Sequence, residues 1–119
     1  MDADEARVFA DEWIAAWNAR DLDRILSHYA DEIVFLSPVA ELVVEEGRVA
    51  GKDALRAYWT TALAAVPDLH FELTGVRVGY ECLTILYRNQ RGQDVAETVE
   101  LGAGGLVVRS FACYFPPSA

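Results

Sequence analysis

Apolar residues in the first half of the chain recur with the period of an α-helix. In residues 6–17 they occupy positions i, i+3, i+4, i+7, i+10 and i+11, which gives a helix one continuous apolar side. A second stripe of this kind covers residues 55–66 and ends before Pro67. Between the two stripes, Asp21 is suited to cap a further short helix. The buried face of that helix is predicted to hold Leu22, Ile25, Leu26 and Tyr29.

The second half of the chain follows the pattern of strands. No helical period recurs there, and four runs are predicted as strands: 69–78, 80–89, 94–101 and 106–115. Turn signals separate these runs at Gly79, at Arg91-Gly92 and at residues 102–105. Consecutive strands joined in this way predict an antiparallel meander.

One more strand is predicted ahead of the last helix. Residues 33–37 form a β-branched and aromatic run that ends at Pro38, and residues 42–44 also permit a short strand. Helices followed by a run of hairpins are typical of an α+β fold. We therefore expect a cone-shaped roll, in which a curved, mostly antiparallel sheet wraps around three N-terminal helices. A pocket is expected at the open end of the cone.

Composition narrows the class of protein. The chain has 119 residues, 53% of them apolar, so we expect a single domain over residues 1–119 with one hydrophobic core. Acidic residues number 19 against 10 Lys and Arg residues, and the net charge of −9 disfavours binding to nucleic acid or to anionic membranes. No apolar run is long enough to span a membrane.

Cysteine and histidine usage indicates neither a disulfide nor a metal site. Cys82 and Cys113 lie in strand-like apolar segments, and we expect both to be buried free thiols of a cytoplasmic protein. Neither His28 nor His70 has another ligand at metal-binding spacing. The sequence predicts no metal site and no cofactor.

Three stretches resemble a known superfamily. Residues 17–32 (WNARDLDRILSHYADE) are similar to its helix-break-helix motif, W-N-x-x-D-L-D-x-I-x-x-x-Y-A-D-D. Residues 51–59 (GKDALRAYW) resemble the start of its third helix, and residues 104–109 (GGLVVR) the entry to its last strand. These are the nuclear transport factor two-like proteins, which include SnoaL-type polyketide cyclases, ketosteroid isomerases and limonene epoxide hydrolases. The resemblance implies a SnoaL-like domain with the cystatin-like form of the α+β roll.

The resemblance carries over few catalytic residues. The general-base Asp of ketosteroid isomerase corresponds to Ser37, which lacks useful basicity near neutral pH, and its oxyanion-hole Tyr corresponds to Trp13. Its second Asp corresponds to Glu97. The Asp-Arg-Asp set of limonene epoxide hydrolase has its nearest counterpart in Arg88 beside Glu97, without a second acid. Glu97 can also stand in for the acid–base Asp of SnoaL-type cyclases, but no histidine here matches their His.

Glu97 is the strongest candidate for a catalytic residue. If Arg91-Gly92 is a two-residue turn, Leu86 lies opposite Glu97 in the sheet. The residues predicted to share its face are Thr84, Leu86, Val95, Val99 and Leu101. Burial on this apolar face would raise the pKa of the carboxyl and suit it to acid–base catalysis. The alternative is a structural salt bridge with Arg88, which lies diagonal to Glu97.

Two hypotheses for the function follow. The residues predicted to line a pocket for a hydrophobic small molecule are Trp13, Trp17, Phe35, Ser37, Trp59 and Tyr114. The first hypothesis is a cofactor-free isomerase, cyclase or hydrolase that uses Glu97. The second is a non-catalytic ligand-binding or dimeric scaffold domain. Many members of the superfamily pair through the sheet, and the outer face here is predicted to carry Ile85, Tyr87, Ala96 and Thr98.

Overall fold

Helices come first and strands dominate afterwards in the computed structural model, which describes residues 1–44 and 46–117. The helices are α1 (Ala3–Asn18), α2 (Leu22–Leu26), α3 (Glu41–Val44) and α4 (Lys52–Ala65). The strands are β1 (Tyr29–Leu36), β2 (Arg48–Ala50), β3 (Glu72–Gly79), β4 (Cys82–Arg88), β5 (Asp94–Leu101) and β6 (Val107–Phe115). A 3₁₀ turn, η1 (Ala103–Gly105), joins β5 to β6. Within the described residues, no helix is long and apolar enough to cross a membrane.

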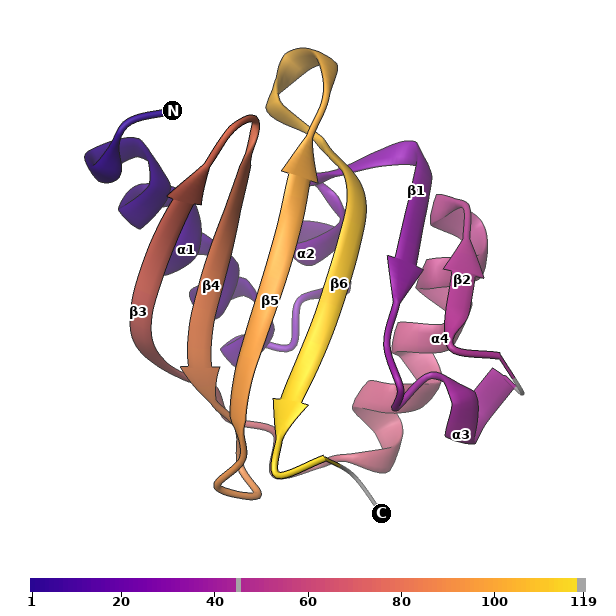
Figure 1. Cartoon of the computed structure of the whole chain (residues 1–119). Helices are drawn as coiled ribbons and strands as arrows, with labels where there is room; N and C mark the ends of the chain where they lie inside the picture. Colours follow the sequence, from indigo (N-terminus) through magenta and orange to yellow (C-terminus); the bar gives the residue numbers. More distant parts are fainter. Residues whose placement is uncertain (45, 118–119) are drawn as a thin grey trace.

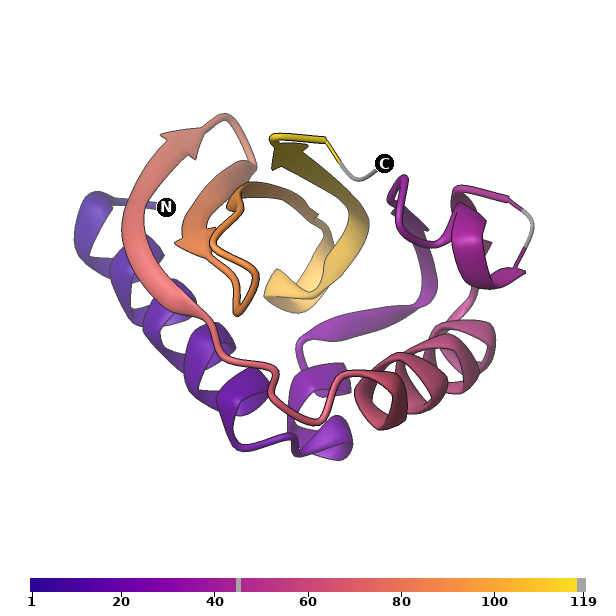
Figure 2. The same cartoon turned by 90° about the horizontal axis from the view of Figure 1, so that it is seen from below.

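The strands form one six-stranded sheet in the order β2-β1-β6-β5-β4-β3 (Figure 1). Neighbouring strands are antiparallel, except that β1 runs parallel to β6. Figure 2 shows the sheet curling above a row formed by α1, α2 and α4. The α+β fold with a curved sheet and N-terminal helices is thus confirmed.

Side-chain caps fix where the first two helices begin. The Asp2 carboxylate accepts a hydrogen bond from the backbone N–H of Glu5 at 2.8 Å, and Asp21 accepts one from the backbone N–H of Arg24 at 3.2 Å. Each cap satisfies an amide that has no partner within its helix. The predicted cap at Asp21 is confirmed.

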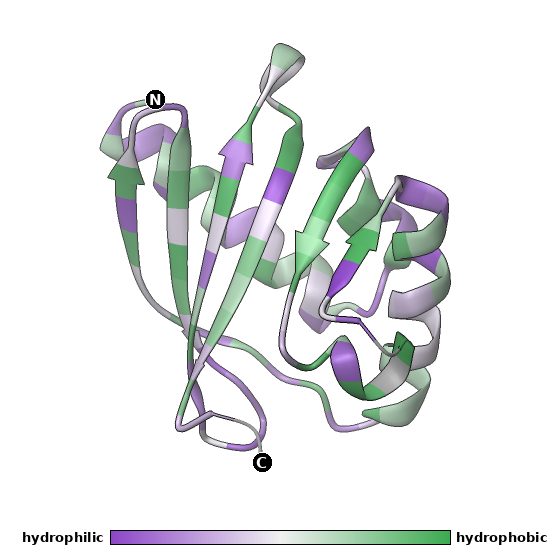
Figure 3. Cartoon of the chain, turned by 45° about the vertical axis from the view of Figure 1, so that its right-hand side comes forward, coloured by the Kyte–Doolittle hydropathy of each residue, from purple (hydrophilic) through white to green (hydrophobic). Residues whose placement is uncertain are grey.

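The concave side of the sheet and the helices enclose the core. Apolar and polar residues alternate along the strands (Figure 3), and β5 buries every second residue. The largest side chains that are almost fully buried come from both layers: Trp13, Tyr29, Ile25, Leu26, Ile33, Leu55, Leu83, Ile85, Val99 and Val107. Burial of this apolar surface is the main stabilising contribution to the fold.

Two predicted elements differ from the structure. Tyr29 does not belong to the second helix, because α2 ends at Leu26 and β1 already begins at Tyr29. Residues 42–44 lie in the short helix α3 and not in a strand, while the small edge strand β2 follows at Arg48–Ala50. Both segments are short, and a run of a few apolar residues does not distinguish helix from strand.

The predicted pairing of β4 with β5 is wrong by one residue. The connecting loop contains three residues, 90–92, because Asn89 pairs with Gln93 and Gly92 adopts a positive φ of 77°. Ile85 therefore lies opposite Glu97, and Leu86 lies opposite Ala96. A shift of one residue moves each side chain of a strand to the other face.

The shift corrects which residues of β4 face the helices. Leu83, Ile85 and Tyr87 are buried on the same side as Glu97, whereas Thr84 and Leu86 are on the outer side. Ile85 and Tyr87 are therefore not part of the outer face. The prediction that Val95 and Val99 share the face of Glu97 is confirmed by their burial.

Both cysteines are free, but they are not buried as predicted. Cys113 is exposed and Cys82 is half-buried. Cys113 lies opposite Ala96 on the outer side of β6, where no second layer covers it in the described chain. An apolar strand segment thus places only alternate residues in the core.

Candidate functional site

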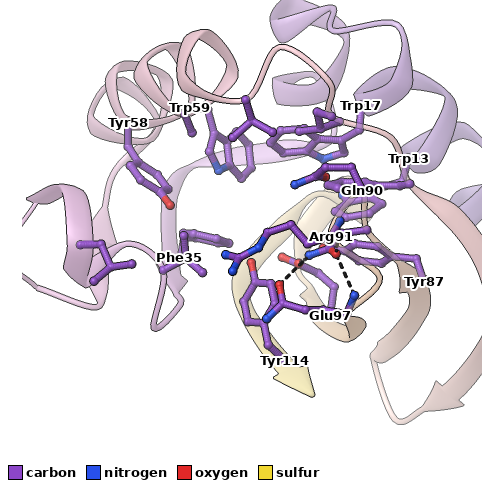
Figure 4. A pocket seen from close by; sticks show the side chains of 18 residues that line it. Trp13, Trp17, Phe35, Tyr58, Trp59, Tyr87, Gln90, Arg91, Glu97 and Tyr114 are labelled. Carbon is purple, nitrogen blue, oxygen red and sulfur yellow. Dashed lines mark hydrogen bonds between the residues drawn. The ribbon is translucent and has the colours of Figure 1, made fainter. Parts of the chain in front are cut away.

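A cavity of about 190 Å³ lies between the helices and the concave side of the sheet. Its wall is mostly aromatic and aliphatic, and its lining residues are Trp13, Trp17, Phe35, Val39, Leu42, Tyr58, Trp59, Ala62, Val66, Leu69, Phe71, Tyr87, Asn89, Gln90, Arg91, Gln93, Glu97 and Tyr114. Figure 4 shows side chains from both layers pointing into this space. Since an apolar cavity of about 150 Å³ holds a benzene molecule, this pocket has room for a small ring system.

The structure brings six of the seven predicted site residues together. The six that line the pocket are Trp13, Trp17, Phe35, Trp59, Glu97 and Tyr114. Ser37 does not line it: this serine is 4% exposed, borders a separate shallow hollow, and its hydroxyl accepts a hydrogen bond from the backbone N–H of Val39 at 3.1 Å. Ser37 therefore caps the turn after β1.

The aromatic side chains form a connected wall. Trp17 and Trp59 meet edge to face with ring centroids 4.8 Å apart, and Phe71 lies against Tyr87 at 4.4 Å. The Nε1–H of Trp13 donates a hydrogen bond to the hydroxyl of Tyr29 at 3.0 Å. Such contacts fix the rings in place and leave their faces to hold an apolar ligand.

Glu97 places a carboxyl group in this aromatic wall. Its side chain comes from the middle of β5, is 3% exposed, and accepts a hydrogen bond from the Ser110 hydroxyl at 2.8 Å. The Tyr87 hydroxyl lies 3.4 Å from the other carboxylate oxygen. Burial raises the pKa of Glu97 to about 7, against the smaller lowering effect of these two hydrogen bonds. At neutral pH the group is therefore close to half ionised.

No cation neutralises Glu97 among the ion pairs of the described residues. Arg88 is on the outer side of β4, with its guanidinium 3.5 Å from Asp94. The predicted alternative, a salt bridge between Arg88 and Glu97, is therefore wrong. The one-residue shift of the hairpin is the cause, because it turns Arg88 away from the face that carries Glu97.

Three tyrosine hydroxyls share the pocket with the carboxyl and stay protonated at neutral pH. Burial, reinforced by the charge of Glu97, raises the pKa of Tyr58 to about 12. The same two causes raise the pKa of Tyr87 and of Tyr114. Protonated phenols are hydrogen-bond donors, so the pocket can offer O–H groups to a ligand oxygen.

The loop between β4 and β5 supplies pocket residues that the sequence pattern does not reveal. Asn89 organises this loop: its Oδ1 accepts hydrogen bonds from the backbone N–H groups of Arg91 and Gln93, both at 3.0 Å. Gln90 and Arg91 thereby reach the pocket. Sequence reasoning assigned Arg91 to a two-residue turn and paired Gln90 with Gln93 across it. The available signal for the longer loop was Asn89 followed by Gly92 at three-residue spacing.

Tyr58 and Tyr87 were missed for different reasons. Tyr58 belongs to the apolar stripe of α4, and a stripe does not tell which of its members border a cavity. Tyr87 was assigned to the outer face by the wrong register. In the described part of the chain, no group of three His, Cys, Asp or Glu side chains is close enough together to hold a metal ion.

A curved sheet over three helices with an aromatic pocket between the layers defines a small-molecule-pocket protein of the cystatin-like roll. The chain belongs to the SnoaL-like family: the sequence profile of the SnoaL-like domain matches residues 10–109. The predicted superfamily is thereby confirmed.

Solved structures support the same assignment. A SnoaL-like protein of unknown function from Burkholderia thailandensis is 42% identical, with a TM-score of 0.91 over 95% of this chain and 96% of that one. A cystatin-like-fold protein of unknown function from Methylobium petroleophilum is 17% identical, with a TM-score of 0.77 over 100% of this chain and 81% of that one. TerC, co-crystallised with polyporic acid, is 13% identical, with a TM-score of 0.74 over 90% and 89% of the two chains. No curated protein matches the chain.

Proposed function

We propose that this protein binds a hydrophobic carbonyl compound and isomerises it without a cofactor, with Glu97 as the proton-transfer group. The observation that carries the proposal is a buried carboxyl in an aromatic pocket, with a pKa raised to about 7 and no ion pair. A carboxyl with such a pKa can both remove and return a proton near neutral pH. A salt-bridged carboxylate with a low pKa would be a weaker base for the first of these two steps.

The chemistry follows from the groups that line the pocket. Ionised Glu97 removes the proton from a carbon next to the ligand carbonyl, so that a C–H bond breaks, an O–H bond forms on Glu97, and the electron pair moves to the carbonyl oxygen. The hydroxyls of Tyr58 and Tyr114 are donors available to this oxygen as negative charge develops. In a ligand with a β,γ C=C bond the enolate extends over that bond, so Glu97 can return the proton to the γ carbon. The O–H bond of Glu97 then breaks, a C–H bond forms, the carbonyl is restored and the C=C bond moves next to it, which completes an isomerisation.

Several observations support this proposal. TerC, which has the same fold, was co-crystallised with polyporic acid, a small organic molecule. Residues 1–119 act in our proposal as one SnoaL-like domain, consistent with a family match over residues 10–109. Two free cysteines, one of them exposed, favour a cytoplasmic location.

Homodimerisation through the outer face of the sheet is part of the proposal. We use the name outer patch for six side chains that the pairing of β4, β5 and β6 places on this face. They are Thr84, Leu86, Ala96, Thr98, Phe111 and Cys113. These six side chains are uncharged, and Phe111 is 38% exposed. Charged side chains lie around them on the same face: Arg77, Arg88, Asp94, Glu100 and Arg109. An uncharged centre with a charged rim is suited to a second copy of the chain.

The second candidate function is ligand binding without catalysis. It is favoured by Ser37, which holds the place of the ketosteroid isomerase base and lies outside the pocket. Among the described residues Glu97 is the one carboxylate in the lining, so the pocket lacks the second acid that several relatives named above use.

Deuterium exchange separates the two functions. With 1-tetralone in D₂O, we expect catalysed exchange of the hydrogens next to the carbonyl, followed by proton NMR, and a loss of about 100-fold or more in Glu97→Gln. The matched control is Glu100→Gln, the same chemical change on the exposed part of β5, which should leave exchange unchanged. Quenching of tryptophan fluorescence by 1-tetralone without any exchange would favour the non-catalytic function.

A further inference from the structure

Two polar atoms in the pocket wall are buried and lack a hydrogen-bond partner. They are Nε1 of Trp17, whose side chain is 6% exposed, and Oε1 of Gln90. Both residues line the same pocket as Glu97, and Figure 4 draws them on the side where Trp13 and Tyr87 lie. Leaving such atoms unpaired in a buried site is unfavourable, because each has lost its hydrogen bonds to water.

The other tryptophan at this part of the wall, Trp13, has no unpaired polar atom. The Nε1–H of Trp13 donates to the Tyr29 hydroxyl at 3.0 Å, so the neighbouring tryptophan has its polar atom satisfied inside the protein. Proton transfer by Glu97 uses neither Trp17 nor Gln90. Their free donor and free acceptor are therefore unexplained by packing and by the proposed reaction.

The two atoms need different kinds of hydrogen-bond partner. An indole N–H only donates, and an amide oxygen only accepts. A ketone, ether or carboxylate of a ligand could accept from Trp17 but would leave the oxygen of Gln90 unpaired. A hydroxyl group both accepts and donates, so a single hydroxyl can satisfy both atoms.

We propose that Trp17 and Gln90 form a subsite for a hydroxyl group of the ligand, and that the ligand is a hydrophobic alcohol or phenol. This inference rests on the proposed function only in that the same pocket holds the ligand. Together with the carbonyl expected near Glu97, it describes a ring compound that carries both a carbonyl and a hydroxyl.

The position of Gln90 is built into the loop that carries it. Asn89, the preceding residue, holds the loop through two backbone hydrogen bonds at 3.0 Å and through a third, at 3.0 Å, from its Nδ2 to Oε1 of Gln93. Trp17 is held by ring contacts with Trp13 and Trp59. Both halves of the subsite are therefore preorganised, which reduces the entropy lost on binding.

Two naphthalene derivatives test the subsite. The probes are 2-naphthol, which can donate and accept, and 2-methoxynaphthalene, which can only accept; their dissociation constants come from NMR titration. We expect the wild-type protein to bind 2-naphthol about tenfold more tightly, which is the effect of one or two buried hydrogen bonds. Gln90→Met should reduce this preference to about threefold or less, because only the hydroxyl can donate to Gln90. Trp17→Phe should weaken both probes and keep the preference, because both can accept from the Trp17 N–H.

Control variants separate the hydroxyl subsite from loss of ring contact. Trp13→Phe removes a similar aromatic area with an N–H that is already bonded, so it should weaken both probes less than Trp17→Phe does. Gln90→Met changes a half-buried loop residue and tests the subsite even if Trp17→Phe disturbs the core. Equal binding of both probes, or a preference that survives Gln90→Met, would overturn the subsite and leave the pocket intact. Failure of both probes to bind would overturn the pocket as well, and with it the proposed function.

Discussion

Glu97 shows how one side chain can be tuned by its surroundings alone. Two hydroxyl donors stabilise the carboxylate, yet the loss of hydration outweighs them and raises its pKa to about 7. Glu12, on the partly exposed surface of α1, shows the opposite case. The hydrogen bond and charge of Arg24 lower the pKa of Glu12 to about 2. The two acids differ because only Glu12 has a cationic partner.

This raised pKa makes the stability of the fold depend on pH. Between about pH 4.5 and about pH 7, the folded protein holds a proton on Glu97 that the unfolded chain releases. The free energy of unfolding therefore decreases as pH rises through this window, by about 3 kcal/mol from this group, and levels off above it. Relative to the wild type, Glu97→Gln should gain about 3 kcal/mol between pH 4.5 and about pH 8. Urea denaturation of both proteins at the two pH values measures this gain.

Glu100→Gln provides the comparison for this measurement, because Glu100 is exposed on the same strand. Its stability relative to the wild type should not change over the same pH range. If the difference between Glu97→Gln and the wild type were also independent of pH, the carboxyl would not be desolvated as the structure shows.

Residue-level prediction from the sequence succeeded where alternation or helical period was enough. Glu97 and five aromatic residues of the pocket were predicted correctly to point inward, because the inward-facing positions follow from the period of the helix or strand that carries each of them. Tyr87 was missed because its face depends on the length of a loop, and Ser37 was placed by resemblance to a position, not by its own contacts. Pocket lining depends on which side chains leave a gap, and no single-element pattern contains this information.

At the scale of elements, side-chain to backbone hydrogen bonds connect the layers. Asn18 belongs to the Trp-Asn motif of the superfamily and is the last residue of α1. Its side chain forms two hydrogen bonds with the backbone of Phe71, just before β3. The Nδ2 group donates to the Phe71 carbonyl at 2.9 Å, and Oδ1 accepts from the Phe71 N–H at 2.8 Å. The motif thus fixes the helix against the first strand of the meander. The sequence reveals the motif, but its partner is 53 residues away and no local pattern indicates it.

Asn18→Ala should therefore loosen this junction. Loss of both hydrogen bonds is expected to lower the free energy of unfolding by about 1–3 kcal/mol and to accelerate hydrogen exchange of the Phe71 amide. Thr60→Ala is the control, since Thr60 is exposed and bonds only to a carbonyl of its own helix at 2.7 Å. Unchanged exchange at Phe71 would show that the contact does not hold the two elements together.

The hairpin loop is a second element whose geometry depends on one side chain. Asn89→Ala removes all three hydrogen bonds of the Asn89 side chain and should lower stability by about 1–3 kcal/mol, while Asn89→Asp keeps the two accepted from the backbone. Because Gln90 and Arg91 follow in this loop, Asn89→Ala should also weaken the binding of 2-naphthol. Denaturation and NMR titration test whether Asn89→Ala lowers stability and 2-naphthol binding more than Asn89→Asp does. Similar behaviour of Asn89→Ala and Asn89→Asp would contradict it.

At the scale of the whole molecule, the order of elements along the chain was predictable and the full order of strands in the sheet was not. Period and turn residues indicate the helices and the meander, and hence the α+β class. The position of β1 beside β6 and the small edge strand β2 depend on contacts between distant segments. The same limit applies to the outer face, since its residues are known only once the register is known.

The outer patch leads to the last prediction, a homodimer formed through the sheet. Uncharged side chains from three adjacent strands meet there, and the concave side of the same sheet is already covered by helices. We expect sedimentation at micromolar concentration to give a dimer, and Thr98→Lys, which places a charge at the centre of the patch, to shift it to monomer. Val8→Lys, at a position 69% exposed on α1, should leave the dimer intact. A monomeric wild-type protein, or equal masses for the two lysine variants, would show that the outer patch does not bind a second copy.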